Sequence, residues 1–186
     1  IPPGGREFLK EAFSGEGIAA MLRLSVVYLF IAVFWALFDQ SGSTWVLQAN
    51  KMDRQFMGIE WLPSQIGALN PVLILLFIPL YNQVLYPVVG RVFAITPLRK
   101  ISLGLFIATG SFLICALIET WIAAGERPNI VWQLIAYGII TAAEVLVSIT
   151  ALEFSYTQAP RKIKSFIMSL FLMSVSLGNL FTAIVN

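Results

Sequence analysis

Histidine is absent from this sequence, and cysteine occurs once, as Cys115. Without histidine, the chain lacks the commonest metal ligand and the base of the usual Ser-His hydrolytic arrangement. A single cysteine cannot form a disulfide framework within the chain. We therefore expect no metal, no other cofactor and no enzymatic activity, and we assign any proton chemistry to carboxylates.

Charge is also scarce. Charged residues make up 12% of the chain and hydrophobic residues 58%, and the mean hydropathy is +0.83. Soluble domains have about 25% charged residues, so this composition predicts an integral membrane protein. The net charge of +2 gives no indication of a nucleic-acid partner. The length of 186 residues suits several spans in one bundle.

Five apolar segments are long enough to cross a bilayer as helices. We expect an all-α fold with spans at about Leu24–Gln48, within Trp61–Gly90, and at Ile101–Ala124, Val131–Tyr156 and Ser165–Asn186.

The positions of the basic residues predict the orientation, since cytoplasmic loops are enriched in lysine and arginine. Three basic residues, Lys51, Arg54 and Arg127, lie on one side of the predicted spans, and the other nine lie on the opposite side. The N-terminal side is therefore expected in the cytoplasm. We expect residues 1–23 to form a cytoplasmic linker, with an amphipathic helix over Arg6–Met21, and residues 24–186 to form the transmembrane bundle.

The two ends of the sequence suggest a longer protein. The chain opens Ile1-Pro2-Pro3 without methionine or a signal peptide, and it stops at Asn186 inside an apolar run. We therefore expect it to be part of a longer polypeptide.

A carboxylate, Glu144, lies in the otherwise uncharged stretch from Pro128 to Leu152. An ionisable group at that depth costs roughly 2.5–3.5 kcal/mol on insertion scales, which marks a functional site. One helical face carries four polar residues, Tyr137, Thr141, Glu144 and Ser148. The centre of this polar stripe is about 20 Å from the outer start of the helix. This polar stripe predicts a binding wall facing an aqueous cavity; the alternative is a Glu144 ion pair that holds helices together.

Other polar residues leave more than one interpretation open. Glu153 points away from Glu144 on an ideal α-helix, and it is either functional or paired with Arg161 or a lysine. Asp39 lies where the first apolar segment breaks. It either closes a gate by pairing with a positive residue on another helix or is an interfacial residue at a helix end. Arg23 is a surface anchor or the partner of an acidic group.

The second and first spans hold further candidates. Trp35 is either a packing residue or a ligand contact, and Asn70, alone, reads as a helix cap. Prolines recur every eight residues, at Pro71, Pro79 and Pro87, which predicts either a kinked packing helix or a bent gating helix.

The combined motifs resemble those of the proton-coupled oligopeptide transporters, a branch of the major facilitator superfamily. The segment FWALFDQSGSTWVLQA at 34–49 resembles the seventh-helix segment of that family. Asn70-Pro71, Leu85-Tyr86-Pro87 and LEFSYTQAP at 152–160 match in the same order. The resemblance covers essentially the whole chain. It implies that the five spans are helices seven to eleven of a twelve-helix carrier, without the last helix and the N-terminal half.

The resemblance also implies roles for individual residues. Glu144 matches the family's tenth-helix glutamate, which contacts the amino group of the bound peptide. Asn70 matches an asparagine that contacts the backbone of the bound peptide. Trp35 lies at a position where the family has a tryptophan beside the binding pocket. Asp39 lies at a position where the family has an acidic residue linked to proton coupling and gating. Phe171 stands where many members have tryptophan. Asn82 stands where some relatives have an aspartate paired with an arginine that matches Arg23.

We therefore predict proton-coupled symport of di- and tripeptides across the cell membrane, with H⁺ as the coupling ion. The expected substrate-binding residues are Glu144, Asn70, Trp35, Ser148 and Phe171, and the expected coupling or gating residues are Asp39, Glu153 and Arg23. The alternatives are a related carrier for another solute, such as nitrate or a peptide-like drug, a non-transporting membrane subunit, and a membrane-embedded enzyme.

Overall fold

The computed structural model describes residues 5–186 and is almost entirely helical. Five helical stretches in this part of the chain are long and apolar enough to cross a membrane. They are Gly15–Ala49, Pro63–Val89, Pro97–Ala123, Val131–Gln158 and Lys164–Val185. Each of the five spans expected from hydropathy is therefore present.

The first span begins earlier than the sequence pattern suggests. The short helix α1 (Gly5–Ala12) is followed by α2 (Gly15–Phe38), so the segment Arg6–Met21, expected as an amphipathic helix or linker, contains a break between two helices. Ser14 starts the new helix, because its hydroxyl accepts a hydrogen bond from the Gly17 N–H at 3.0 Å. The span therefore starts at Gly15 rather than Leu24. Residues 1–4 lie outside the described residues, and the cytoplasmic location of residues 1–23 stays a prediction.

The first span is interrupted where its apolar character breaks. A 3₁₀ turn, η1 (Asp39–Gly42), separates α2 from α3 (Thr44–Ala49). The loop beyond α3 holds a small hairpin of β1 (Gln55–Phe56) and β2 (Ile59–Glu60). Met57 and Gly58 both have positive φ, as a two-residue hairpin turn requires.

Asp53 joins the two loops at this end of the molecule. Its carboxylate accepts hydrogen bonds from the Gln55 N–H at 3.1 Å and from the Asn129 side-chain amide at 3.0 Å. Its backbone carbonyl accepts from the Ile130 N–H at 2.8 Å. These donors, the Gln55 N–H first, hold the pKa of Asp53 below its usual range.

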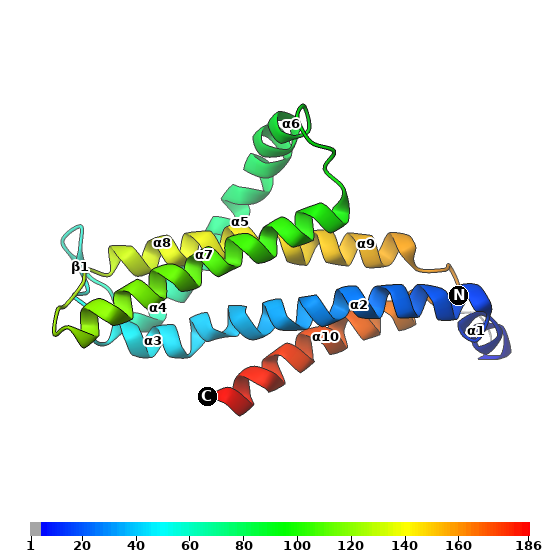
Figure 1. Cartoon of the computed structure of the whole chain (residues 1–186), viewed down its shortest axis with the longest axis horizontal. Helices are drawn as coiled ribbons and strands as arrows, with labels where there is room; N and C mark the ends of the chain where they lie inside the picture. The colour runs from blue at the N-terminus through cyan, green and yellow to red at the C-terminus, as the bar shows by residue number, and fades with distance from the viewer. Residues whose placement is uncertain (1–4) are drawn as a thin grey trace.

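The second span is bent. It consists of α4 (Pro63–Gly67), α5 (Leu69–Leu80), a π-helical turn η2 (Tyr81–Leu85) and α6 (Tyr86–Val89). Pro79 lies inside α5 and Pro87 in the first turn of α6, on either side of the π turn. In Figure 1, α6 lies away from the other helices. The bend expected from the prolines is present, and its role in gating stays a prediction.

The remaining helices pack as two pairs (Figure 1). The helix α10 (Lys164–Val185) packs along α2, and α7 (Pro97–Ala123) packs along the fourth span, which comprises α8 (Val131–Glu144), the π turn η3 (Val145–Ile149) and α9 (Thr150–Gln158). The fourth span is the most buried of the five.

Two glycines allow the helices of each pair to approach closely. A Cβ atom added at Gly178 would lie 2.5 Å from the Ala32 carbonyl oxygen, and one at Gly104 would lie 2.6 Å from Val147 Cγ2. Small residues at such contacts are typical of membrane helix pairs. Tyr28 adds a hydrogen bond from its hydroxyl to the Ile167 carbonyl at 3.3 Å.

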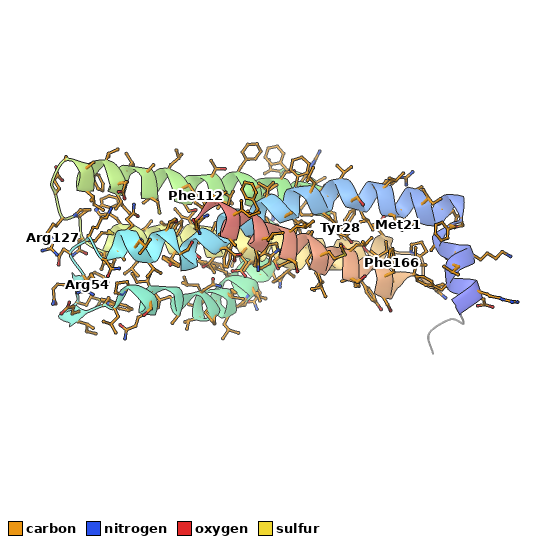
Figure 2. The ribbon with its side chains drawn as sticks, turned by 90° about the horizontal axis from the view of Figure 1, so that it is seen from below. Met21, Tyr28, Arg54, Phe112, Arg127 and Phe166 are labelled. Carbon is orange, nitrogen blue, oxygen red and sulfur yellow. The ribbon has the colours of Figure 1, made fainter. Side chains whose placement is uncertain are left out.

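The basic and less basic ends of the bundle lie apart. Figure 2 shows Arg54 and Arg127 at the end opposite Met21. At the Met21 end, α1 contacts the connection between α9 and α10 through the Glu7–Lys162 ion pair, at 3.5 Å. It also contacts α10 itself, through the edge-to-face rings of Phe8 and Phe166.

Candidate functional site

Glu144 occupies the last position of α8, directly before the π turn η3. The residue is half-buried, and its Oε2 atom is buried without a hydrogen-bond partner. The ion pairs found among residues 5–186 join other residues, so the alternative of a Glu144 ion pair within this part of the chain is wrong. A buried carboxylate oxygen with no donor can accept from a cationic ligand or hold a proton.

Asn70, in the first turn of α5, lies beside Glu144. Its Oδ1 atom accepts a hydrogen bond from the Thr141 hydroxyl at 2.6 Å. The cap of α5 is Ala68, so Asn70 does not serve as the cap that its position before a proline suggests. The structure thus brings together Glu144, Asn70 and Thr141, from the second and fourth spans.

The outer part of the polar stripe on α8 is packed against neighbouring spans. Tyr137 is buried and donates its hydroxyl to the Ser41 carbonyl, and Thr141 is fully buried. A cavity of about 190 Å³ adjoins them, lined by Phe38, Ser41, Gly42, Gly67, Asn70, Tyr137, Ile140 and Thr141. On this helix, the expected binding wall is therefore limited to the half-buried Glu144 and Ser148. Tyr137 and Thr141 are instead hydrogen-bonded to residues of other spans.

The π turn after Glu144 changes the geometry expected for Glu153. A π turn adds a residue to the helical turn, so the half-turn offset of an ideal α-helix does not apply between Glu144 and Glu153. Glu153 is exposed and forms no ion pair among residues 5–186. Lys162 pairs instead with Glu7, and Lys164 lies over the Tyr156 ring.

Asp39 opens the 3₁₀ turn of the first span and is half-buried. One oxygen of its carboxylate lies 2.7 Å from the Asn179 side-chain amide, which donates to it when its nitrogen faces the carboxylate. No basic side chain of the described residues pairs with Asp39. Asn179 was not among the residues expected from the sequence; an amide within the apolar run of the fifth span was its only signal.

Trp35 lies one turn before Asp39 on α2. Its ring contacts Phe34 and Phe38 edge-to-face, with centroids 5.8 and 5.4 Å away, and its buried Nε1 has no hydrogen-bond partner. Packing therefore explains the position of the Trp35 ring, and the indole N–H stays free to donate a hydrogen bond.

Phe171 and Arg23 lie outside the cluster around Glu144. Phe171 is buried on α10, and its ring contacts that of Tyr28 edge-to-face at 6.0 Å. Arg23 is exposed at a mainly apolar groove of about 680 Å³ between α2 and α7. Arg23 forms no ion pair within the described part of the chain.

Comparison with known proteins places this arrangement in one family. The sequence model of the POT family matches residues 7–186. "Peptide transporter family 2" of Caenorhabditis elegans is 42% identical over 58% of this chain and 14% of its own length. "Solute carrier family 15 member 2" of Rattus norvegicus is 36% identical over 73% of this chain and 19% of its own length.

The solved structures agree with the fold. The crystal structure of the POT family transporter PepTSo superposes with a TM-score of 0.84 at 41% identity, over 91% of this chain and 33% of that one. An auto-inhibited POT family peptide transporter gives 0.79 at 39% identity, over 90% of this chain and 32% of that one. This chain thus spans a third or less of the length of these four relatives. The chain belongs to the POT family, and it is an all-α, multi-pass integral membrane protein.

Proposed function

We propose that this chain supplies five helices of the C-terminal bundle of a carrier that moves di- and tripeptides together with protons across the cell membrane. Relatives described as peptide transporters, and POT family structures of the same fold, support this function. In the proposed carrier, the five spans are helices seven to eleven, the N-terminal side is cytoplasmic, and the N-terminal half of the same carrier completes the site. The excess of basic residues on the N-terminal side supports that orientation.

The observation that carries the proposal is the buried, unpartnered Oε2 atom of Glu144 beside Asn70. A peptide in solution presents an ammonium group next to a backbone carbonyl. Glu144 would accept from the ammonium, and Asn70 would donate to the carbonyl. Charge-assisted hydrogen bonds are roughly twice as strong as neutral ones, so Glu144 would supply most of the recognition.

The other site residues have supporting or coupling roles in this proposal. Ser148 and the Trp35 indole N–H would offer further polar contacts, and Phe171, whose ring packs on Tyr28 outside the Glu144 cluster, would support the site from α10. Asp39 would link protonation to gating, with Glu153 and Arg23 acting nearer the cytoplasmic side. The proton is the proposed coupling ion, and within this chain carboxylates would carry it, because these 186 residues include no histidine.

The Glu144→Gln variant of the complete carrier tests the proposed site. It keeps the shape of the side chain but removes its charge, so dialanine uptake into liposomes should fall at least about tenfold, as expected for a lost charge-assisted hydrogen bond. Glu126→Gln is the matched control, because Glu126 is an exposed loop residue. Normal dialanine uptake by Glu144→Gln would exclude this role for Glu144.

A further inference from the structure

The buried hydroxyl of Thr141 donates a hydrogen bond to the Asn70 side chain. Thr141 is fully buried on α8, and its Oγ1 lies 2.6 Å from Asn70 Oδ1 on α5. A threonine hydroxyl carries one proton, and a side-chain amide accepts only through its oxygen. Because a hydroxyl can also accept, two partners orient the Asn70 amide together: Thr141 donates to Oδ1, and the NH₂ group faces the Glu144 carboxylate.

The orientation of the amide has a chemical consequence. With Oδ1 held by Thr141, the NH₂ group of Asn70 is the end that donates: one N–H faces the Glu144 carboxylate, and the second N–H is available to a ligand. Thr141 and Glu144 lie three residues apart on α8, which places them on one face of the helix. Asn70 lies beside Glu144 on that face. A donor and an acceptor are thus adjacent, as the carbonyl and ammonium of a peptide N-terminus require.

We infer that Thr141 is a positioning residue for peptide recognition: it holds the Asn70 amide so that its NH₂ group donates to the substrate carbonyl next to the ammonium at Glu144. This inference rests on the proposed function. Thr141 is too buried to contact the peptide itself and acts through Asn70. Without the Thr141 hydroxyl, Asn70 Oδ1 loses its donor and the amide is held by Glu144 alone, so its NH₂ group is less well positioned for the substrate carbonyl.

Thr141→Val tests the inference in the complete carrier, because valine keeps the shape of threonine and lacks the hydroxyl. The apparent KM for dialanine should rise about fivefold to tenfold, the effect of one hydrogen bond, while the maximal rate is retained. Thr141→Ser keeps a hydroxyl and should restore most of the affinity. In an Asn70→Ala background, Thr141→Val should have no further effect on KM.

Thr182→Val is the matched control for loss of a buried hydroxyl. Thr182 is buried on α10 and donates to the Ala36 carbonyl at 2.9 Å, so the variant loses a comparable bond and should keep the KM of the wild type. Thr141→Ala loses the same hydroxyl with less bulk and replaces Thr141→Val if the latter does not fold.

Three results would overturn the inference. An unchanged KM in folded Thr141→Val, or the same rise in KM with and without Asn70, would exclude positioning through Asn70 while leaving peptide transport intact. Absence of dialanine uptake by the wild-type carrier would overturn the proposed function and this inference together.

Discussion

At the scale of single residues, two carboxylates of this chain are in opposite situations. Asp53 lies in a loop and accepts from a backbone N–H and from an amide. Glu144 lies within a membrane span and keeps one buried oxygen without a donor. An ionisable group at the bilayer centre costs roughly 2.5–3.5 kcal/mol on insertion scales, and a bound ammonium or proton would reduce that cost. Asp53 therefore stabilises the loops, whereas Glu144 is suited to a ligand.

The hydrogen bonds that Gln55 and Asn129 donate to the Asp53 carboxylate, here called the Asp53 clamp, give a prediction about how stability depends on pH. Because its pKa is lowered in the folded protein, its contribution to stability is present above the unfolded pKa and is lost only as the pH falls through the lowered value. Asp53→Asn, which stays neutral, should lower the thermal unfolding midpoint by the same amount near neutral pH and at about pH 5.5. The difference should disappear only below the ordinary value of 3.8.

Thermal unfolding of the purified carrier at several pH values measures this difference. Asn129→Ala removes one donor to the same carboxylate and serves as a second variant of the clamp. A difference between wild type and Asp53→Asn that has already disappeared at pH 3.8 would show that Asp53 does not have the lowered pKa inferred from its donors.

The charged residue of the proposed site could be predicted from the sequence, but the contacts made by the residues around it could not. A carboxylate in an uncharged run is visible without a structure, so Glu144 was expected. The Thr141–Asn70 bond joins residues 71 positions apart, and the Asp39–Asn179 contact also joins different spans. Such contacts depend on how the helices pack, which hydropathy and periodicity do not specify.

At the scale of helices, the close approach of α2 and α10 depends on Gly178. Gly178→Ala should lower the free energy of unfolding by about 1–3 kcal/mol, because the new methyl group would lie 2.5 Å from the Ala32 carbonyl oxygen and 2.8 Å from Trp35 Cβ. Chemical or thermal unfolding of the detergent-purified carrier measures the change.

Gly138→Ala is the matched control on α8, since nothing lies within 4 Å of a Cβ atom added there. Alanine favours helix over glycine by about 1 kcal/mol, so this variant should be as stable as the wild type or slightly more stable. Equal stabilities of Gly178→Ala and Gly138→Ala would contradict the close packing of α2 on α10.

The number and order of the spans could be predicted from the sequence because each span is a long apolar run. The start of the first span could not, because Ser14 caps a helix that begins among charged residues, at Gly15. The π turns at Tyr81–Leu85 and Val145–Ile149 were not predicted either. Nothing in their sequences, YNQVL and VLVSI, is particular to a π turn. The first π turn contacts the fourth span through the hydrogen bond from Tyr81 to the Ala142 carbonyl, at 3.1 Å, and Tyr81 packs with Val145 and Leu146 of the second π turn.

At the scale of the whole molecule, the proposed transport requires more than these five helices. The proposed binding residues lie on the first, second, fourth and fifth spans, and the chain covers a third of PepTSo. In the proposed carrier, two halves rock around a site near the middle of the membrane. The exposed apolar surfaces of the described helices suit contact with lipid or with further helices of such a carrier.

The most direct test of the account is the accumulation of labelled dialanine in liposomes that contain the complete carrier, with and without an inward proton gradient. We predict accumulation that depends on the gradient and is blocked by other dipeptides, and an Asp39→Asn variant that exchanges dialanine without concentrating it. A folded carrier that accumulates neither dialanine nor any of a range of dipeptides under the gradient would contradict the account and would direct attention to a different solute.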